Sequence, residues 1–278
     1  MDFKDILVHV DSTPASAVRL RLGLALARRF GARLSGLHVV PEPDVPPYFK
    51  PSAVERIAEI YRENARKAAI LAEANFRDAT KSIDILTAWH SVEGDMAQLL
   101  AERARFADLL LLGQSDTENP PTLAAFSLPE KVVVHAGTPL LVVPTRGAFD
   151  VIGRHVLVTW DGSREAARAV HDAMPLLQTA ERVSLLAVDP HRQGHVHPTA
   201  NAAEAAAHLA RHGVQTEPTE ILSGEKNVTD VLLAHVTNVG ADLLVMGAYG
   251  HPRLLEFVLG GTTQAVLERA AVPILVSH

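Results

Sequence analysis

Cysteine is absent from the 278 residues, so the chain forms no disulfide bond and offers no thiolate to a metal. No apolar run approaches the length needed to cross a bilayer, and the N-terminus lacks the apolar core of a signal peptide. Basic runs are missing as well, and the formal net charge is −6, which argues against a nucleic-acid partner. These absences predict a soluble, cytoplasmic protein without membrane or nucleic-acid contacts.

The residue patterns of efficient catalysis are missing too. No pair of carboxylates stands out for acid–base work, and Ser163 and Ser223 lack the flanking glycines of a G-x-S-x-G nucleophile. One loop carries His191, His195 and His197. Three loop histidines without cysteine or helical spacing are more typical of a polar loop than of zinc ligands. We therefore predict no metal site and no efficient catalysis.

What the sequence does contain is an internal repeat. Two strand-like segments end in Asp11 and Asp161, and small residues and a helix rich in Ala, Leu and Arg follow each of them. Helices are expected at about 14–30 and 164–178, and a longer one at about 52–79. Five pairs of strand-like segments match, namely 5–10 with 155–160, 33–40 with 182–188, 83–86 with 218–222, 107–113 with 241–247, and 137–144 with 271–276.

Strands that alternate with helices predict a parallel sheet covered on both faces, and continuous apolar runs are typical of buried parallel strands. Each half is therefore expected to be a flavodoxin-like or Rossmann-like, doubly wound α/β domain, with a five-stranded parallel sheet in the order 3-2-1-4-5. We place the domains at 1–146 and 153–278. Such sheets bind ligands beyond the carboxyl ends of their strands, so Asp161 and Gly247 are expected to face one crevice.

The segment 241–263 carries the most informative motif. A strand-like run is followed by turn glycines and hydroxyl residues at the start of a helix, namely Gly247, Gly250, Gly260, Gly261, Thr262 and Thr263. Glycines beside a helix N-terminus allow an anion to lie on exposed N–H groups, so the spacing G-x2-G-x9-G predicts a phosphate cradle. The segment is neither a Walker A motif, because it has no lysine at the required place, nor G-x-G-x-x-G. Taken alone, it is also consistent with ordinary turn glycines.

The first half keeps only part of this pattern. Asp11 matches Asp161 and Gly113 matches Gly247, but acidic and proline residues fill the segment 114–121. Carboxylates repel a polyphosphate, and proline removes N–H donors. We therefore predict that only the second half binds a phosphate-bearing ligand.

Two such repeats with this motif resemble a tandem universal stress protein of the UspA family. The resemblance covers nearly the whole chain and rests on 156–163 and on Gly247-x2-Gly250-x9-Gly260. It implies an adenine nucleotide in the second half (ATP, AMP or ADP, with or without Mg²⁺), with Asp161 at the ribose and the glycines and a hydroxyl residue at the phosphates. The residues so implied are Asp161, Val188, Met246, Gly247, Gly250, Gly260, Gly261, Thr262 and Thr263.

One position departs from the family pattern. The resemblance implies a hydroxyl residue directly after the third glycine, where this chain has Gly261, and Thr262 and Thr263 come later. The resemblance also implies a stress-response sensor or regulator, with slow ATP hydrolysis as the upper limit of activity. It further implies protein partners. It also implies that segments 140–143 and 274–276 pair within one chain, so that the two halves form an intramolecular pseudo-dimer. A homodimer of two such chains is a further possibility.

Alternatives remain for the function and for single residues. The chain could be an interaction scaffold of the same fold that binds no nucleotide, with Gly261 marking a lost site. It could also be an enzyme such as a nucleotidyl transferase, although no evident base or metal cluster supports this. Asp161 could simply cap the following helix, since aspartate is a good N-cap.

Overall fold

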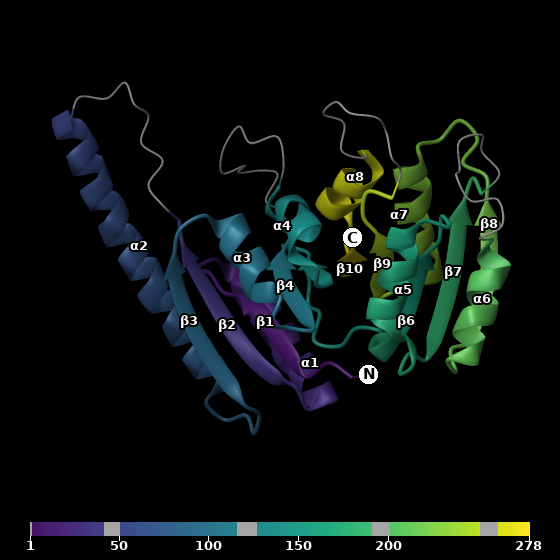
Figure 1. The fold of residues 1–278 in the computed structure, drawn as a ribbon, viewed down its shortest axis with the longest axis horizontal. Helices are drawn as coiled ribbons and strands as arrows, with labels where there is room; N and C mark the ends of the chain where they lie inside the picture. Colours follow the sequence, from purple (N-terminus) through teal and green to yellow (C-terminus); the bar gives the residue numbers. More distant parts are fainter. Residues whose placement is uncertain (1, 42–50, 116–126, 191–200, 251–260) are drawn as a thin grey trace.

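The computed structural model describes residues 2–41, 51–115, 127–190, 201–250 and 261–278, which form ten strands and eight helices (Figure 1). The first half contains β1 (Asp5–His9), α1 (Pro14–Phe30), β2 (Arg33–Val40), α2 (Pro51–Thr80), β3 (Thr87–Glu93), α3 (Met96–Ala104), β4 (Leu109–Gly113), α4 (Leu128–Ala136) and β5 (Leu140–Val143). The second half contains β6 (His155–Thr159), α5 (Arg164–Leu177), β7 (Arg182–Val188), α6 (Ala202–Arg211), β8 (Thr216–Ile221), α7 (Val228–Val239), β9 (Leu243–Gly247), α8 (Gly261–Arg269) and β10 (Ile274–Ser277).

The strands form one sheet in the order β3-β2-β1-β4-β5-β10-β9-β6-β7-β8. The strands of each half are parallel, and the predicted order 3-2-1-4-5 is confirmed in both. The halves meet at β5 and β10, which pair antiparallel with Leu141 opposite Leu275. The last strands of the two repeats therefore pair within one chain, which confirms the predicted pseudo-dimer.

Helices cover both faces of this sheet. One core cluster contains side chains from α1, α2, α5 and α6, and the other contains side chains from α3, α4, α7 and α8. In β4, Leu109 and Leu111 belong to the first cluster and Leu110 and Leu112 to the second, and all four are fully buried. A parallel strand between two layers of helices has no solvent face, so its sequence is continuously apolar.

Helix α1 shows how local sequence sets the ends of an element. Pro14 stands in the first turn, where its missing N–H costs no hydrogen bond. At the other end Gly31 adopts a φ of 60°, and its N–H approaches the carbonyl groups of Ala27 and Arg28. This left-handed C-cap favours glycine and ends the helix. The predicted helix at 14–30 is confirmed.

The predicted position of the third strand is wrong in the first half, whereas in the second half the expected segment 218–222 overlaps β8 and starts two residues late. The expected segment 83–86 is an irregular connection, in which Ile83 and Ile85 pack on the core and Leu86 is 76% exposed, and β3 follows it. In the second half β8 begins before the expected segment, and Leu222 lies beyond its end. Both strands are edges of the sheet, so they are more polar than the inner strands, and an apolar run does not mark them.

Helix α2 is the largest difference between the halves. It has 30 residues, or about 45 Å, whereas its counterpart α6 has 10 residues. Ala72 and Phe76 anchor it to the core, but Ile57 and Ile60 remain exposed. In Figure 1 its first turns extend past the ends of β2 and β3. No helix in the described ranges is long and apolar enough to cross a membrane.

The β5–β10 junction should contribute strongly to stability. Leu275 is 0% exposed at its centre, so Leu275→Ala should lower the free energy of unfolding by about 2–5 kcal/mol through lost burial and a residual cavity. The control Leu222→Ala removes the same atoms at a site that is 77% exposed, and should cost less than about 0.5 kcal/mol. Urea unfolding followed by circular dichroism measures both, and equal losses would contradict the role of the junction.

Candidate functional site

The candidate site lies where β6 and β9 end. These strands are parallel neighbours, with Val158 opposite Val245, so Asp161 and Gly247 follow the same edge of the sheet. The chain runs from β6 outward to β7 and β8, and then returns to place β9 on the other side of β6. Strand order therefore reverses between β6 and β9, and the structure brings Asp161 and Gly247 together at this switch point.

Asp161 shapes the start of α5. Its Oδ1 accepts hydrogen bonds from the Ser163 backbone N at 3.0 Å and from Ser163 Oγ at 2.6 Å. Ser163 Oγ in turn accepts from the Ala166 backbone N at 3.1 Å, so Ser163 is the N-cap and Asp161 supports it. Asp161 is exposed. An exposed carboxylate beside a helix N-terminus is placed to accept further hydrogen bonds, for example from hydroxyl groups.

Two of the predicted glycines touch this same helix start. A methyl group added to Gly247 would lie 2.5 Å from the Glu165 carbonyl carbon and 2.5 Å from the Ala166 backbone N. One added to Gly250 would lie 2.6 Å from Ser163 Oγ. Packing against α5 thus requires glycine at both positions, and this requirement holds with or without a ligand.

The remaining predicted site residues lie at the start of α8. Gly260 lies outside the described residues, and Gly261 is exposed at the first position of the helix. Gly261 has no described atom within 4 Å of an added methyl group, and its φ is not left-handed. Thr262 is half-buried, whereas Thr263 is buried and its Oγ1 accepts from the Tyr249 backbone N at 3.4 Å. A side chain at Gly261 would therefore meet no described atom at its first carbon.

Two further predicted residues, Val188 and Met246, belong to the core. Met246 is 5% exposed in the cluster on the α7 and α8 face, and Val188 packs against the same cluster from the end of β7. The structure therefore places both on one face of the sheet, close to strand ends, with Val188 only half-buried.

The loop after β9 also reaches the first half. Tyr249 has a left-handed φ of 61°, and its hydroxyl donates to Glu130 Oε1 in α4 at 3.3 Å. Burial and the Glu130 carboxylate both raise the pKa of Tyr249. Glu130 is itself part of a capping box with Ser127, whose backbone N donates to Glu130 Oε2 at 2.6 Å. The candidate site thus contacts a helix start in the other half.

Comparison with known sequences decides the family. The sequence model of the universal stress protein family matches residues 2–144 and, a second time, residues 153–278. This chain belongs to the universal stress protein family.

Individual relatives agree with this assignment. Universal stress protein Slr1230 of Synechocystis sp. is 31% identical over 153 residues, which are 52% of this chain and 49% of that protein. This chain thus spans about half the length of its curated relative. The crystal structure of a universal stress protein from Archaeoglobus fulgidus shares the fold with a TM-score of 0.69 at 17% identity, over 98% of this chain and 96% of that chain. A functionally unknown protein from Pseudomonas aeruginosa has a TM-score of 0.61 at 16% identity, over 99% and 92% of the two chains.

In this universal stress protein, the corresponding place in the first half is filled by a side chain. Arg19 is 3% exposed, and its Nη2 donates to Asp11 Oδ2 at 2.6 Å while its Nε donates to the His9 carbonyl at 3.2 Å. The guanidinium also lies against Gly113, the counterpart of Gly247. The second repeat has Ala169 at the position of Arg19. An ion pair therefore occupies the space between Asp11 and Gly113.

Arg19 and Asp11 alter the environment of their neighbours. Burial raises the pKa of Asp11, but the Arg19 charge and the Thr13 hydrogen bonds outweigh it, so that the pKa is lowered. His9 is 5% exposed, and burial, helped by the Arg19 charge, lowers its pKa to about 3. Its Nε2 is buried without a hydrogen-bond partner in the described chain. His9 is consequently neutral in the folded protein at physiological pH.

The histidines considered as metal ligands cannot be placed in the structure. His191, His195 and His197 lie outside the described residues, and among the described ones no group of three or more His, Cys, Asp or Glu side chains could hold a metal ion. A different histidine cluster was not predicted. The His171 and His208 rings on α5 and α6 have centroids 5.3 Å apart, and His212 lies 4.7 Å from His208.

His171 and His208 line a groove of about 520 Å³ between α5 and α6, which Trp160 also lines. Burial, followed by the charges of His212, His171 and Arg211, lowers the pKa of His208. The spacing of His208 and His212, one helical turn apart, was the signal available in the sequence.

The stability of this protein should fall in mild acid because of His9. The unfolded chain protonates His9 near pH 6.5, whereas the folded protein resists protonation until about pH 3. The free energy of unfolding is therefore highest above pH 6.5, where His9 is neutral in both states. It falls below pH 6.5, because only the unfolded chain takes up the proton, and the loss is about 2 kcal/mol at pH 5. His9→Thr introduces the residue found at the equivalent Thr159, and should flatten the loss between pH 6.5 and pH 5. Urea unfolding at several pH values measures this, and parallel curves for the two proteins would refute it.

Proposed function

We propose that the second half binds one adenine nucleotide, and that the chain acts as a nucleotide-responsive regulator in the stress response. The observation that carries the proposal is the meeting of three features at the switch point. These are the exposed carboxylate of Asp161, the glycines that bring the chain after β9 against α5, and the open N-terminus of α8. Family membership supports the same conclusion.

Each group has a proposed task. Asp161 accepts hydrogen bonds from the ribose hydroxyls, and the half-buried Val188 supplies apolar surface for the base, with the buried Met246 in the core cluster against which Val188 packs. The phosphates lie over Gly247 and Gly250 and end at the first turn of α8, where unpaired N–H groups and the helix dipole favour an anion. Gly260, Gly261, Thr262 and Thr263 complete this turn, with Thr262 as the hydroxyl donor, since Thr263 Oγ1 already accepts from the Tyr249 backbone N. Mg²⁺ would accompany ATP through its phosphates.

A regulator suits this site better than an enzyme. Asp161, the one carboxylate among the proposed ligand contacts, already accepts two hydrogen bonds from Ser163, so among the described residues we assign none to the activation of a water molecule. The alternative is a scaffold of the same fold that binds no nucleotide, for which Gly261 in place of a hydroxyl residue is the favouring observation. Mass spectrometry of the small molecules released from denatured, freshly purified protein separates the two, because a scaffold releases no nucleotide.

Binding should be limited to one nucleotide per chain. In the first half the Arg19 guanidinium already pairs with Asp11 and covers Gly113, so a ligand would have to displace a partly buried ion pair. Breaking this pair would leave the charge of Arg19, whose side chain is 4% exposed, without its partner, and that is unfavourable. Isothermal titration calorimetry with ATP should therefore give one site per chain. Two equivalent sites would show that the Arg19–Asp11 pair does not close the first half.

Gly261 is the position at which the phosphate contact can be tested without disturbing the fold. A charged side chain at Gly250 would collide with Ser163, whereas Gly261 has open space. Gly261→Ser offers a hydroxyl and should tighten ATP binding by up to about tenfold, with a smaller effect on AMP, which lacks the outer phosphates. Gly261→Glu places a carboxylate there and should abolish binding of ATP.

Calorimetric titration of both nucleotides into both variants measures these effects. Thermal unfolding serves as the control for an intact fold, because glutamate is favourable in the first turn of a helix. Unchanged ATP affinity in Gly261→Glu would remove the start of α8 from the site.

A further inference from the structure

Helix α2 carries an apolar stripe that nothing in the described chain covers. Ile57 is 40% exposed, Ile60 is 57% exposed and Leu71 is 49% exposed. They lie beside the face that holds Ala58, Ala72 and Phe76, all of which are buried. Single exposed apolar residues are ordinary on a protein surface, but several along one face of a helix mark an interaction surface.

The stripe has the spacing of a coiled coil. Six positions along it are separated alternately by three and four residues, as the a and d positions of a heptad are. Four of these positions are apolar and the two central ones are polar. These positions are Ile57, Ile60, Asn64, Lys67, Leu71 and Ala74, and all of them are exposed. They span 18 residues, or about 26 Å of helix. We call these six residues the α2 seam.

We propose that the α2 seam pairs with the α2 seam of a second copy of this chain, as an antiparallel two-helix coiled coil. The seam is self-complementary in this direction. Ile57 then faces Ala74 of the other copy, Ile60 faces Leu71, and Asn64 faces Lys67. Each a residue thus meets a d residue, and two polar layers at the centre separate two apolar layers at each end.

Charge favours the antiparallel direction over the parallel one. Parallel pairing sets Lys67 against Lys67 of the other copy in the middle of the interface, which is unfavourable. Antiparallel pairing brings Lys67 close to Glu63 of the other copy, and these two residues already form an ion pair within one helix at 3.2 Å. The central polar layers therefore set both register and direction.

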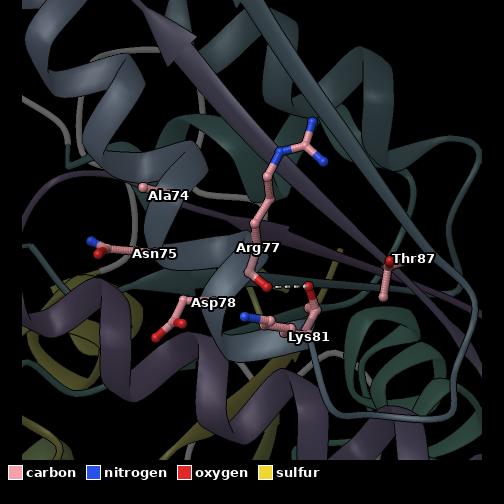
Figure 2. Close-up of a pocket in the computed structure, with 7 residues that line it drawn as sticks. Ala74, Asn75, Arg77, Asp78, Lys81 and Thr87 are labelled. Carbon is pink, nitrogen blue, oxygen red and sulfur yellow. Dashed lines mark hydrogen bonds between the residues drawn. The ribbon is translucent and has the colours of Figure 1, made fainter.

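A hollow at the end of the seam fits the start of the partner helix. It has a volume of about 760 Å³ and is lined by Ala74, Asn75, Asp78 and neighbouring residues of α2 and β3 (Figure 2). Asn75 and Asp78 project to one side of the helix there. In the antiparallel register this side receives the first turn of α2 from the other copy. A carboxylate such as Asp78 beside a helix N-terminus is stabilising.

The oligomeric state of variants tests the proposal. The wild-type protein should dimerise in the micromolar range in sedimentation-velocity runs, and Ile60→Lys or Leu71→Lys should weaken dimerisation at least about tenfold. The comparison variant is Ile70→Lys, because Ile70 is 61% exposed on the same helix at a g position, which flanks the α2 seam and is not part of it. It should weaken dimerisation clearly less than Ile60→Lys or Leu71→Lys. Circular dichroism of the three variants should match, since all three positions are exposed.

The absence of native cysteine allows the direction to be tested with no background. The double variant Ile60→Cys with Leu71→Cys should form a covalent dimer on mild oxidation, and either single variant should form little. Within one helix these positions are about 16 Å apart, which is too far for an internal disulfide.

Three results would overturn the proposal. The first is a wild-type protein that stays monomeric into the millimolar range, and the second is an Ile70→Lys variant that dissociates as readily as Ile60→Lys. The third is cross-linking of the single-cysteine variants as fast as of the double variant, which indicates parallel pairing. None of the tested positions belongs to the proposed nucleotide site, so these outcomes leave the proposed function untouched.

Discussion

The antiparallel pairing of β5 with β10 is the constraint on which the rest of the structure depends. It joins two parallel sheets into one, so strands that would each be an exposed edge become the centre of the molecule. It also reverses the strand direction at the line where the two halves meet. Among the described strands β3 and β8 remain as edges, and both are largely polar, which discourages pairing with other chains.

Within the second half, the first turn of α5 serves both packing and the candidate site. Ser163 caps the helix, Asp161 holds Ser163, and Gly247 and Gly250 lie against this turn. The glycine spacing that predicts a phosphate cradle therefore has a second physical cause, namely the close approach of two backbone segments. The two causes are compatible, because the same close approach brings the chain after β9 to the carboxylate of Asp161.

Much of the fold could be predicted because its signals are local and repeated. Continuous apolar runs identify inner strands such as β4, and Pro14 and Gly31 mark the ends of α1. The edge strand β3 could not be located, since a half-exposed strand has no continuous apolar run. The same limit applies to the site. Asp161 and the glycines stand out in the sequence, whereas the contact of Tyr249 with Glu130 depends on how the two halves pack. Arg19 is an intermediate case, because comparison with Ala169 shows a difference but not where the side chain points.

The Arg19–Asp11 pair shows what is gained by carrying both halves on one chain. In a dimer of identical subunits, an arginine at this position would appear in both clefts at once, so closing one would close the other. A covalent tandem removes that coupling, since each repeat mutates separately. One copy can then place an ion pair after its first strand, while the other keeps an exposed aspartate and two glycines packed against the following helix. The first half becomes a dedicated support for the second, and the molecule behaves as a heterodimer whose subunits can never exchange.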